Sequence, residues 1–143
     1  MKEHEDADIK AIVSEVKGGK CLSDESLVTL IEKRSGMSDC SRGWILDGLP
    51  LNKRQCELLN KKGIVPTLLL SLKMTELDIK KRVQKINEPE YDYYSEVVHD
   101  RLEATRKSLI EIEIYYTNKY NNVRVIEGHL SKWGIFEQAR AEI

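Results

Sequence analysis

The chain has 143 residues and a mass of 16.5 kDa, which is the size of one domain. Hydrophobic residues make up 41% and charged residues 33%, so a packed core is expected and wholesale disorder is not. The 23 Lys and Arg residues nearly balance the 24 Asp and Glu residues, which excludes the strongly basic composition of a general nucleic-acid binder. No apolar run is long enough for a membrane span, and the first residues do not form a signal peptide. Three cysteines without a CxxC pair favour a reducing, cytoplasmic compartment over a disulfide framework or a zinc site.

Helix and strand patterns alternate along the chain. Helices are expected at about residues 9–17, 23–36, 52–63, 75–83 and 97–116, and a last helix begins at 131. Strands are expected at 43–47, 67–72 and 123–126. Ser23, Asn52 and Ser131 are the predicted N-caps, and residues 1–8 are expected to fray. The order predicts one α/β domain over 1–143, with a parallel sheet, flanking helices and right-handed crossovers.

The sharpest local feature is Asp47-Gly48-Leu49-Pro50, directly after a predicted strand. Ligands of open parallel sheets bind beyond the carboxyl ends of the strands. An acid there can hold Mg²⁺, usually through water, and a glycine lets a ligand approach the backbone. The alternative is a plain turn at the end of a strand, with Asp47 capping a helix.

Three further side chains suit nucleotide chemistry. Gln55 lies one turn into a predicted helix, and its amide can offer a donor and an acceptor to a base edge. Arg82 and Arg101 flank a tyrosine-rich segment, and two converging guanidinium groups would suit phosphate oxygens. The alternative for all three is an exposed position on a solvated helix face.

In this order, the motifs resemble those of adenylate kinase and its nucleoside monophosphate kinase relatives, from about Ile9 to the end of the chain. Residues 43–50 resemble the family signature Gly-aromatic-aliphatic-aliphatic-Asp-Gly-aromatic-Pro-Arg, and Gln55 falls five residues after the Pro, as in the family. Arg82 resembles the arginine that opens the family's lid. Asp92 and the run Arg101-Leu102-Glu103 resemble the residues that close it.

The resemblance implies phosphoryl transfer between ATP and AMP, with Mg²⁺ accompanying ATP. It also implies a role for individual residues: Asp47 near the magnesium, Gly48 and Gln55 in the monophosphate site, the backbone of Lys20, Cys21 and Leu22 along the adenine, Arg82 and Arg101 as catalytic arginines on the phosphates, and Gly128 at the ATP base.

The departures from the family pattern argue against efficient kinase activity. No G-x-x-x-x-G-K phosphate-binding loop occurs, so the chain is expected to begin after that part of the family fold. Leu51, Ile86 and Glu90 stand where the family has arginines, and Glu90 would repel phosphate. We therefore expect the chain by itself to be inactive or very weak as a kinase, with adenine-nucleotide binding weak or lost.

Two other functions stay open. A non-catalytic module could keep this fold as a structural or protein-interaction platform of a multi-domain protein, and the resemblance extends to ciliary and flagellar proteins of that kind. An unrelated α/β binding domain would make the Asp-Gly-x-Pro match a coincidence.

The family's phosphate-loop strand lies between the strands that match residues 43–47 and 67–72. Without it, buried backbone groups would lack partners, which is costly. We therefore expect that these two strands pair directly, or that a missing N-terminal segment or a protein partner supplies a strand that completes the sheet.

Overall fold

The computed structural model describes Lys10, Ile12 and residues 22–84 and 96–143. The chain divides into two compact units, residues 1–65 and 66–143, which are described separately. The predicted frayed start, most of the predicted helix at 9–17 and the tyrosine-rich segment lie outside the described residues. That the whole chain forms a single domain stays a prediction.

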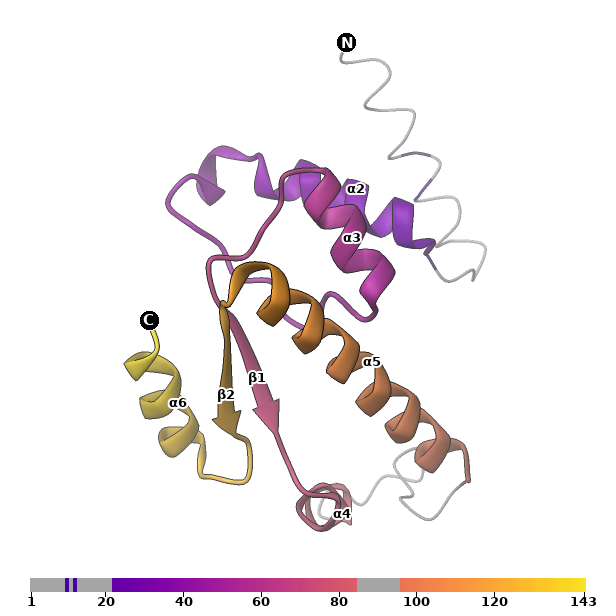
Figure 1. Cartoon of the computed structure of the whole chain (residues 1–143), viewed down its shortest axis with the longest axis vertical. Helices are drawn as coiled ribbons and strands as arrows, with labels where there is room; N and C mark the ends of the chain where they lie inside the picture. The colour runs from indigo at the N-terminus through magenta and orange to yellow at the C-terminus, as the bar shows by residue number, and fades with distance from the viewer. Residues whose placement is uncertain (1–9, 11, 13–21, 85–95) are drawn as a thin grey trace. The chain divides into compact units, whose positions relative to one another are not determined.

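In the first unit the described elements are two α-helices and one short 3₁₀ helix: α2 (Asp24–Ser35), η1 (Ser38–Cys40) and α3 (Lys53–Lys61) (Figure 1). Both predicted caps are confirmed. Ser23 accepts a hydrogen bond from the Ser26 N–H, and Asn52 accepts one from the Gln55 N–H. These side chains satisfy backbone donors that the first turn of a helix leaves without partners.

The core of the first unit lies between α2 and α3. Val28 and Ile31 of α2 and Leu59 of α3 are buried together. Val28 and Ile31 are three residues apart, a spacing that places them on one face of the helix. Five partly buried hydrophobic residues pack around this cluster, namely Leu27, Leu46, Leu49, Leu58 and Ile64.

The predicted strand at 43–47 is wrong, because these residues form neither strand nor helix. A strand exists only where a neighbour pairs with its backbone, and the described sheet contains two other segments. The expectation that residues 43–47 pair directly with the next strand is therefore also wrong for the described residues. Trp44 and Ile45 are exposed, although their apolar character had suggested a buried strand.

The second unit has the element order β1 (Leu69–Lys73), α4 (Glu76–Gln84), α5 (Glu96–Tyr120), β2 (Val123–Glu127) and α6 (Lys132–Ala141). β1 and β2 are parallel neighbours, with Leu69 beside Val123 and Lys73 beside Glu127. The predicted strands at 67–72 and 123–126 are thus confirmed with small shifts of their bounds. Ser131 caps α6 as predicted, accepting a hydrogen bond from the Gly134 N–H.

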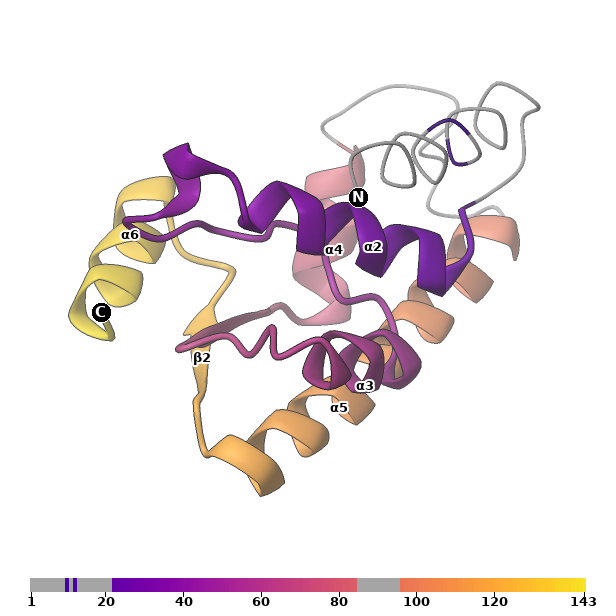
Figure 2. The same cartoon turned by 90° about the horizontal axis from the view of Figure 1, so that it is seen from above.

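The helices α5 and α6 flank β2 from opposite sides (Figures 1 and 2). Ile112 and Tyr116 of α5 and Ile126 of β2 are buried. Ser71 of β1, also buried, donates a hydrogen bond to Glu113 of α5. This arrangement confirms the predicted fold class, an α/β fold with a parallel sheet flanked by helices.

Candidate functional site

Gln55 is buried inside the first unit, and each end of its side-chain amide makes a hydrogen bond there. Its side chain is on the first turn of α3 and the residue is only 5% exposed. The amide Oε1 accepts a hydrogen bond from the Leu51 N–H at 2.7 Å, and Nε2 donates one to Asp24 Oδ1 at 2.7 Å. The expectation of an exposed, solvated glutamine is therefore wrong. One N–H of the amide and one lone pair of its oxygen are thus used by the chain itself.

Asp24 joins the starts of the two helices. Its carboxylate accepts a hydrogen bond from the Gln55 amide and a second one from Asn52 Nδ2, at 3.4 Å. The same carboxylate lies 3.8 Å from Arg54 Nε. Arg54 also donates a hydrogen bond to Glu25, and this bond holds the pKa of the Glu25 carboxyl below its ordinary value. Because Arg54 and Glu25 are exposed, water screens much of this pair. The cluster is a cross-link between α2 and α3 in which the Gln55 amide takes part.

The loop with Asp47 and Gly48 is exposed. Gly48 has φ +73°, a left-handed conformation that glycine adopts without strain, and the Leu49–Pro50 peptide bond is cis. Asp47 makes no hydrogen bond or ion pair with any residue that the structure describes, so it does not cap a helix there. No group of three or more His, Cys, Asp or Glu side chains that could hold a metal occurs among those residues. Asp47 thus offers one carboxylate, which fits Mg²⁺ only together with phosphate oxygens.

In the second unit, two predicted site residues meet at the carboxyl ends of the strands. Arg82 Nη2 donates a hydrogen bond to the carbonyl oxygen of Gly128 at 3.1 Å. Gly128 follows β2, and its N–H donates to the Lys73 carbonyl at the end of β1, at 2.8 Å. Arg82 is exposed, and among the described residues only the Gly128 carbonyl accepts a hydrogen bond from its guanidinium.

Gly128 is buried where only a glycine fits. A Cβ at this position would lie 2.7 Å from Met74 Cγ and 3.0 Å from the Lys73 carbonyl oxygen. Both distances are shorter than ordinary van der Waals contacts, so a larger residue would push the ends of β1 and β2 apart. The glycine therefore keeps the two strand ends close, which brings its carbonyl within reach of Arg82.

Charged side chains surround these strand ends. Lys73 Nζ lies 3.1 Å from Glu113 of α5, and His129 Nδ1 lies 3.3 Å from Glu127. Lys73 is thus already paired with a carboxylate, whereas the guanidinium of Arg82 contacts a neutral carbonyl. An anion at this edge would find in Arg82 a cation without an acidic partner among the described side chains.

None of the contacts that the structure describes brings the remaining predicted site residues to Gln55 or to the strand ends at Gly128. Arg101 is exposed near the start of α5, and its carbonyl accepts a hydrogen bond from Thr105. Leu22 is half-buried ahead of α2. Lys20, Cys21 and the predicted lid positions 86, 90 and 92 lie outside the described residues.

Sequence reasoning missed Asp24 and Glu113. Asp24 is the residue after the N-cap Ser23, an ordinary place for an acid at a helix start, and it is 31 residues from Gln55. Glu113 lies in a long charged helix and is 42 residues from Ser71. No local pattern signals either contact, because each pairing depends on how helices and strands pack.

The comparisons with known proteins find adenylate kinases among the proteins similar to this chain. No family model matches the chain. Adenylate kinase 9 of Mus musculus is 24% identical over 151 aligned residues that cover the whole chain. The adenylate kinase of Coxiella burnetii (strain Dugway 5J108-111) is 31% identical over 68 residues, which cover 48% of the chain. The chain is adenylate-kinase-like.

The adenylate-kinase-like chain matches only part of each relative. It spans 8% of the length of the mouse protein, and the aligned segment spans 29% of the bacterial enzyme. None of the helices that the structure describes is both long and apolar enough to cross a membrane.

Proposed function

We propose that this chain is an adenylate-kinase-like domain, related to phosphoryl transfer between ATP and AMP, which is inactive or very weak as an isolated chain. The observation that carries the proposal is the state of Gln55. The residue that the resemblance assigns to adenine reading is buried, and both ends of its amide bond to Leu51 and Asp24. A base that took the place of these partners would remove the 2.7 Å hydrogen bond from Gln55 to Asp24, which is unfavourable.

The sequence departures support the same conclusion. Catalysis of phosphoryl transfer depends on positioning and charge stabilisation of the phosphates. The chain contains no G-x-x-x-x-G-K loop, and Leu51 replaces the arginine expected after Pro50. Arg82 at the end of the sheet is one cation, which is too little to neutralise a polyphosphate without Mg²⁺ or further arginines.

A coupled assay of ADP production with ATP, AMP and Mg²⁺ tests the proposal. We expect turnover far below the 1–100 per second, roughly, that is typical of kinases. Turnover in that range would overturn it, because efficient transfer would require phosphate contacts that the chain is proposed to lack.

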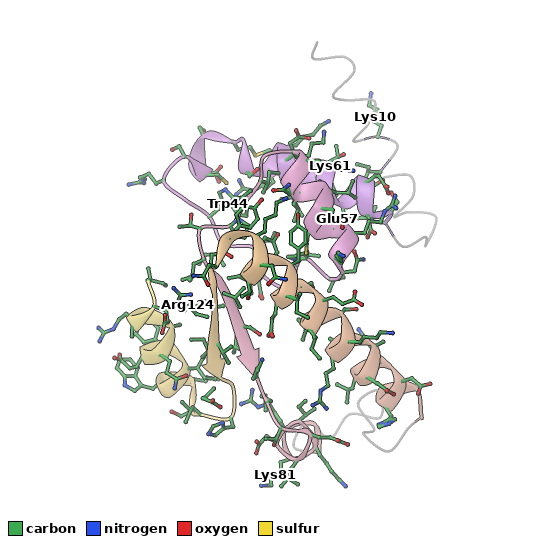
Figure 3. The ribbon with its side chains drawn as sticks, viewed as in Figure 1. Lys10, Trp44, Glu57, Lys61, Lys81 and Arg124 are labelled. Carbon is green, nitrogen blue, oxygen red and sulfur yellow. The ribbon has the colours of Figure 1, made fainter. Side chains whose placement is uncertain are left out.

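Isothermal titration with AMP tests the state of Gln55 directly. We expect weak or undetectable binding, and the same result for Gln55→Ala and for the control Glu57→Ala. Glu57 is exposed on the same helix and is labelled in Figure 3. Micromolar binding that Gln55→Ala weakens and Glu57→Ala does not would show that Gln55 reads the base despite its internal partners. Circular dichroism melting of each variant separates loss of binding from loss of folding.

A second candidate is a non-catalytic structural or protein-interaction module. One specific observation favours it, namely the sheet of two strands, which has an outer edge on β1 with no neighbouring strand among the described segments. Absence of binding to AMP, ADP and ATP alike would favour this function over a surviving nucleotide site.

A further inference from the structure

Asp47 and Gly48 form an Asp-Gly step in a part of the first unit that has no regular secondary structure. Residues 43–52 belong to neither a helix nor a strand, and Gly48 has φ +73°. Both residues of the step are exposed within this unit. The amide nitrogen of Gly48 can close a succinimide ring on the side-chain carboxyl of Asp47. Because these two groups belong to neighbouring residues, their reaction needs no other part of the chain.

Two other aspartates of the described chain show which contacts protect such a step. The Asp39 carboxylate accepts hydrogen bonds from Arg34 at 2.8 and 3.0 Å, and the next amide, that of Cys40, donates to a backbone carbonyl at 3.0 Å. The Asp78 carboxylate accepts a hydrogen bond from the Thr75 hydroxyl at 2.6 Å, and the next amide donates to the Thr75 carbonyl at 3.0 Å. In both places the carboxylate and the neighbouring nitrogen are held apart by partners of their own.

The step at Asp47 has none of these restraints among the described residues. Neither the Asp47 carboxylate nor the Gly48 N–H makes a hydrogen bond there. Glycine has no side chain to hinder attack by its own nitrogen, and it changes its backbone conformation at little cost. Rotation about the bonds of Asp47 alone therefore brings the nitrogen and the carboxyl carbon together.

We propose that Asp47 is a modification site, at which the folded chain isomerises spontaneously to isoaspartate through a succinimide. The Gly48 nitrogen attacks the carbon of the protonated Asp47 carboxyl, a C–N bond forms, and the carboxyl OH leaves with the amide hydrogen as water. Water then adds to one of the ring carbonyls and breaks the C–N bond at that carbonyl. Cleavage at the side-chain carbonyl restores aspartate, whereas cleavage at the main-chain carbonyl gives isoaspartate. The water lost in the first step is regained in the second, so the mass of the chain is unchanged.

Isomerisation would change the loop between two anchored residues. Leu46 and Leu49, on either side of the step, pack against the buried cluster of α2 and α3. In isoaspartate the backbone runs through Cβ, which lengthens it by one methylene group and leaves the free carboxylate on Cα. The longer loop must therefore shift, and the carboxylate that the resemblance places near magnesium changes its position. This inference does not depend on nucleotide binding.

Peptide mapping of the full 143-residue chain, incubated in its folded state near neutral pH and at physiological temperature, detects the product. Trypsin releases the step in the peptide of residues 43–53. We expect a second form of this peptide to accumulate with time, with unchanged mass and a different retention time, together with a minor form lighter by one water. The protease Asp-N, which cleaves before aspartate and not before isoaspartate, should leave the second form uncut.

The same digest contains its own controls. The peptides with Asp39 and Asp78 should each stay a single form, because their carboxylates and the following amides are hydrogen-bonded. A sample unfolded in guanidinium chloride shows the rate that the Asp-Gly step has without the fold. A folded chain that forms no isomer at Asp47 would overturn the proposal, whether or not the unfolded sample forms it. Equal amounts of isomer at Asp39 and Asp47 would also overturn it, because the local contacts would then have no influence.

The matched variants are Asp47→Glu and Asp47→Asn. Glutamate keeps the charge at this exposed position, but its longer side chain would have to close a larger ring, so we expect complete loss of the isomer. Asparagine keeps the ring size and loses ammonia in place of water, so we expect the succinimide and its two products to form faster than in the unmodified chain. An isomer that persists in Asp47→Glu, or a rate that Asp47→Asn does not increase, would contradict the succinimide route and overturn the proposal.

Discussion

The two units treat their predicted nucleotide residues in opposite ways. In the first unit Gln55 is buried and both ends of its amide bond to the same unit. In the second unit Arg82 is exposed and donates a hydrogen bond to one backbone carbonyl at the end of the sheet. Both residues were assigned by the same resemblance. The resemblance thus gives both residues a nucleotide role, whereas the structure gives their side chains very different partners.

The units also differ in what holds them together. The first relies on two capped helices, a small aliphatic cluster and the Asp24 network. The second relies on a parallel strand pair whose ends meet at Gly128. These differences predict different responses to substitution.

The largest expected effect is in the aliphatic cluster of the first unit. Leu59→Ala should lower the free energy of unfolding by about 2–5 kcal/mol, because Leu59 is 2% exposed and its loss leaves a cavity against Val28 and Ile31. Urea denaturation measures this. The control Leu51→Ala, at an exposed position, should stay within about 0.5 kcal/mol of the unmodified chain. Similar losses for both variants would mean that the cluster is not the core of this unit.

A glycine in each unit gives the next comparison. Gly128→Ala should destabilise the second unit by about 1–3 kcal/mol, because its Cβ would crowd Met74 and the Lys73 carbonyl. Gly36→Ala, at the end of α2, meets only ordinary contacts and has φ −79°. It should be neutral or stabilising by up to about 1 kcal/mol. Thermal denaturation distinguishes the two, and a neutral Gly128→Ala would show that the strand ends can separate freely.

The smallest expected effect is the pH dependence of two exposed ion pairs in the first unit. The hydrogen bond from Arg54 lowers the pKa of Glu25 from 4.5, and the hydrogen bond from Arg34 lowers that of Asp39 from 3.8. Since the folded pKa is the lower one, each pair stabilises the fold above the ordinary value, and this contribution disappears as pH falls through the lowered value. Exposure keeps both contributions small.

Urea midpoints at about pH 6 and about pH 3 test this dependence. The decrease in midpoint on acidification should be smaller in the double variant Arg34→Gln, Arg54→Gln than in the unmodified chain. Lys53→Gln, which removes an exposed cation of the same unit, should keep the full decrease. If Lys53→Gln made the fall in urea midpoint as small as the double variant does, the fall would depend on net charge and not on the two ion pairs.

Local chemistry made much of the fold predictable. Ser23, Asn52 and Ser131 cap their helices through their own side chains, and the cap positions are visible in the sequence. The strands at β1 and β2 were found because continuous apolar runs followed by turn residues suit a parallel sheet. The same rule failed for residues 43–47, because an apolar run indicates the capacity to form a strand and not the presence of a neighbour.

The candidate site was less predictable. The hydrogen bond between Arg82 and Gly128 was not predicted, because the resemblance assigned each residue separately to ATP. The burial of Gln55 was not predicted either, because its partner Asp24 is 31 residues away and only the packing of α2 on α3 brings it near.

The amino-acid sequence by itself determined where the helices begin, which runs can be strands and the adenylate-kinase-like order of motifs, because these depend on side chains close together in the chain. Tertiary structure alone decided that residues 43–47 form no strand and that the Gln55 amide bonds to Leu51 and Asp24. Each of those outcomes depends on a partner that is distant in the sequence or absent from the described residues.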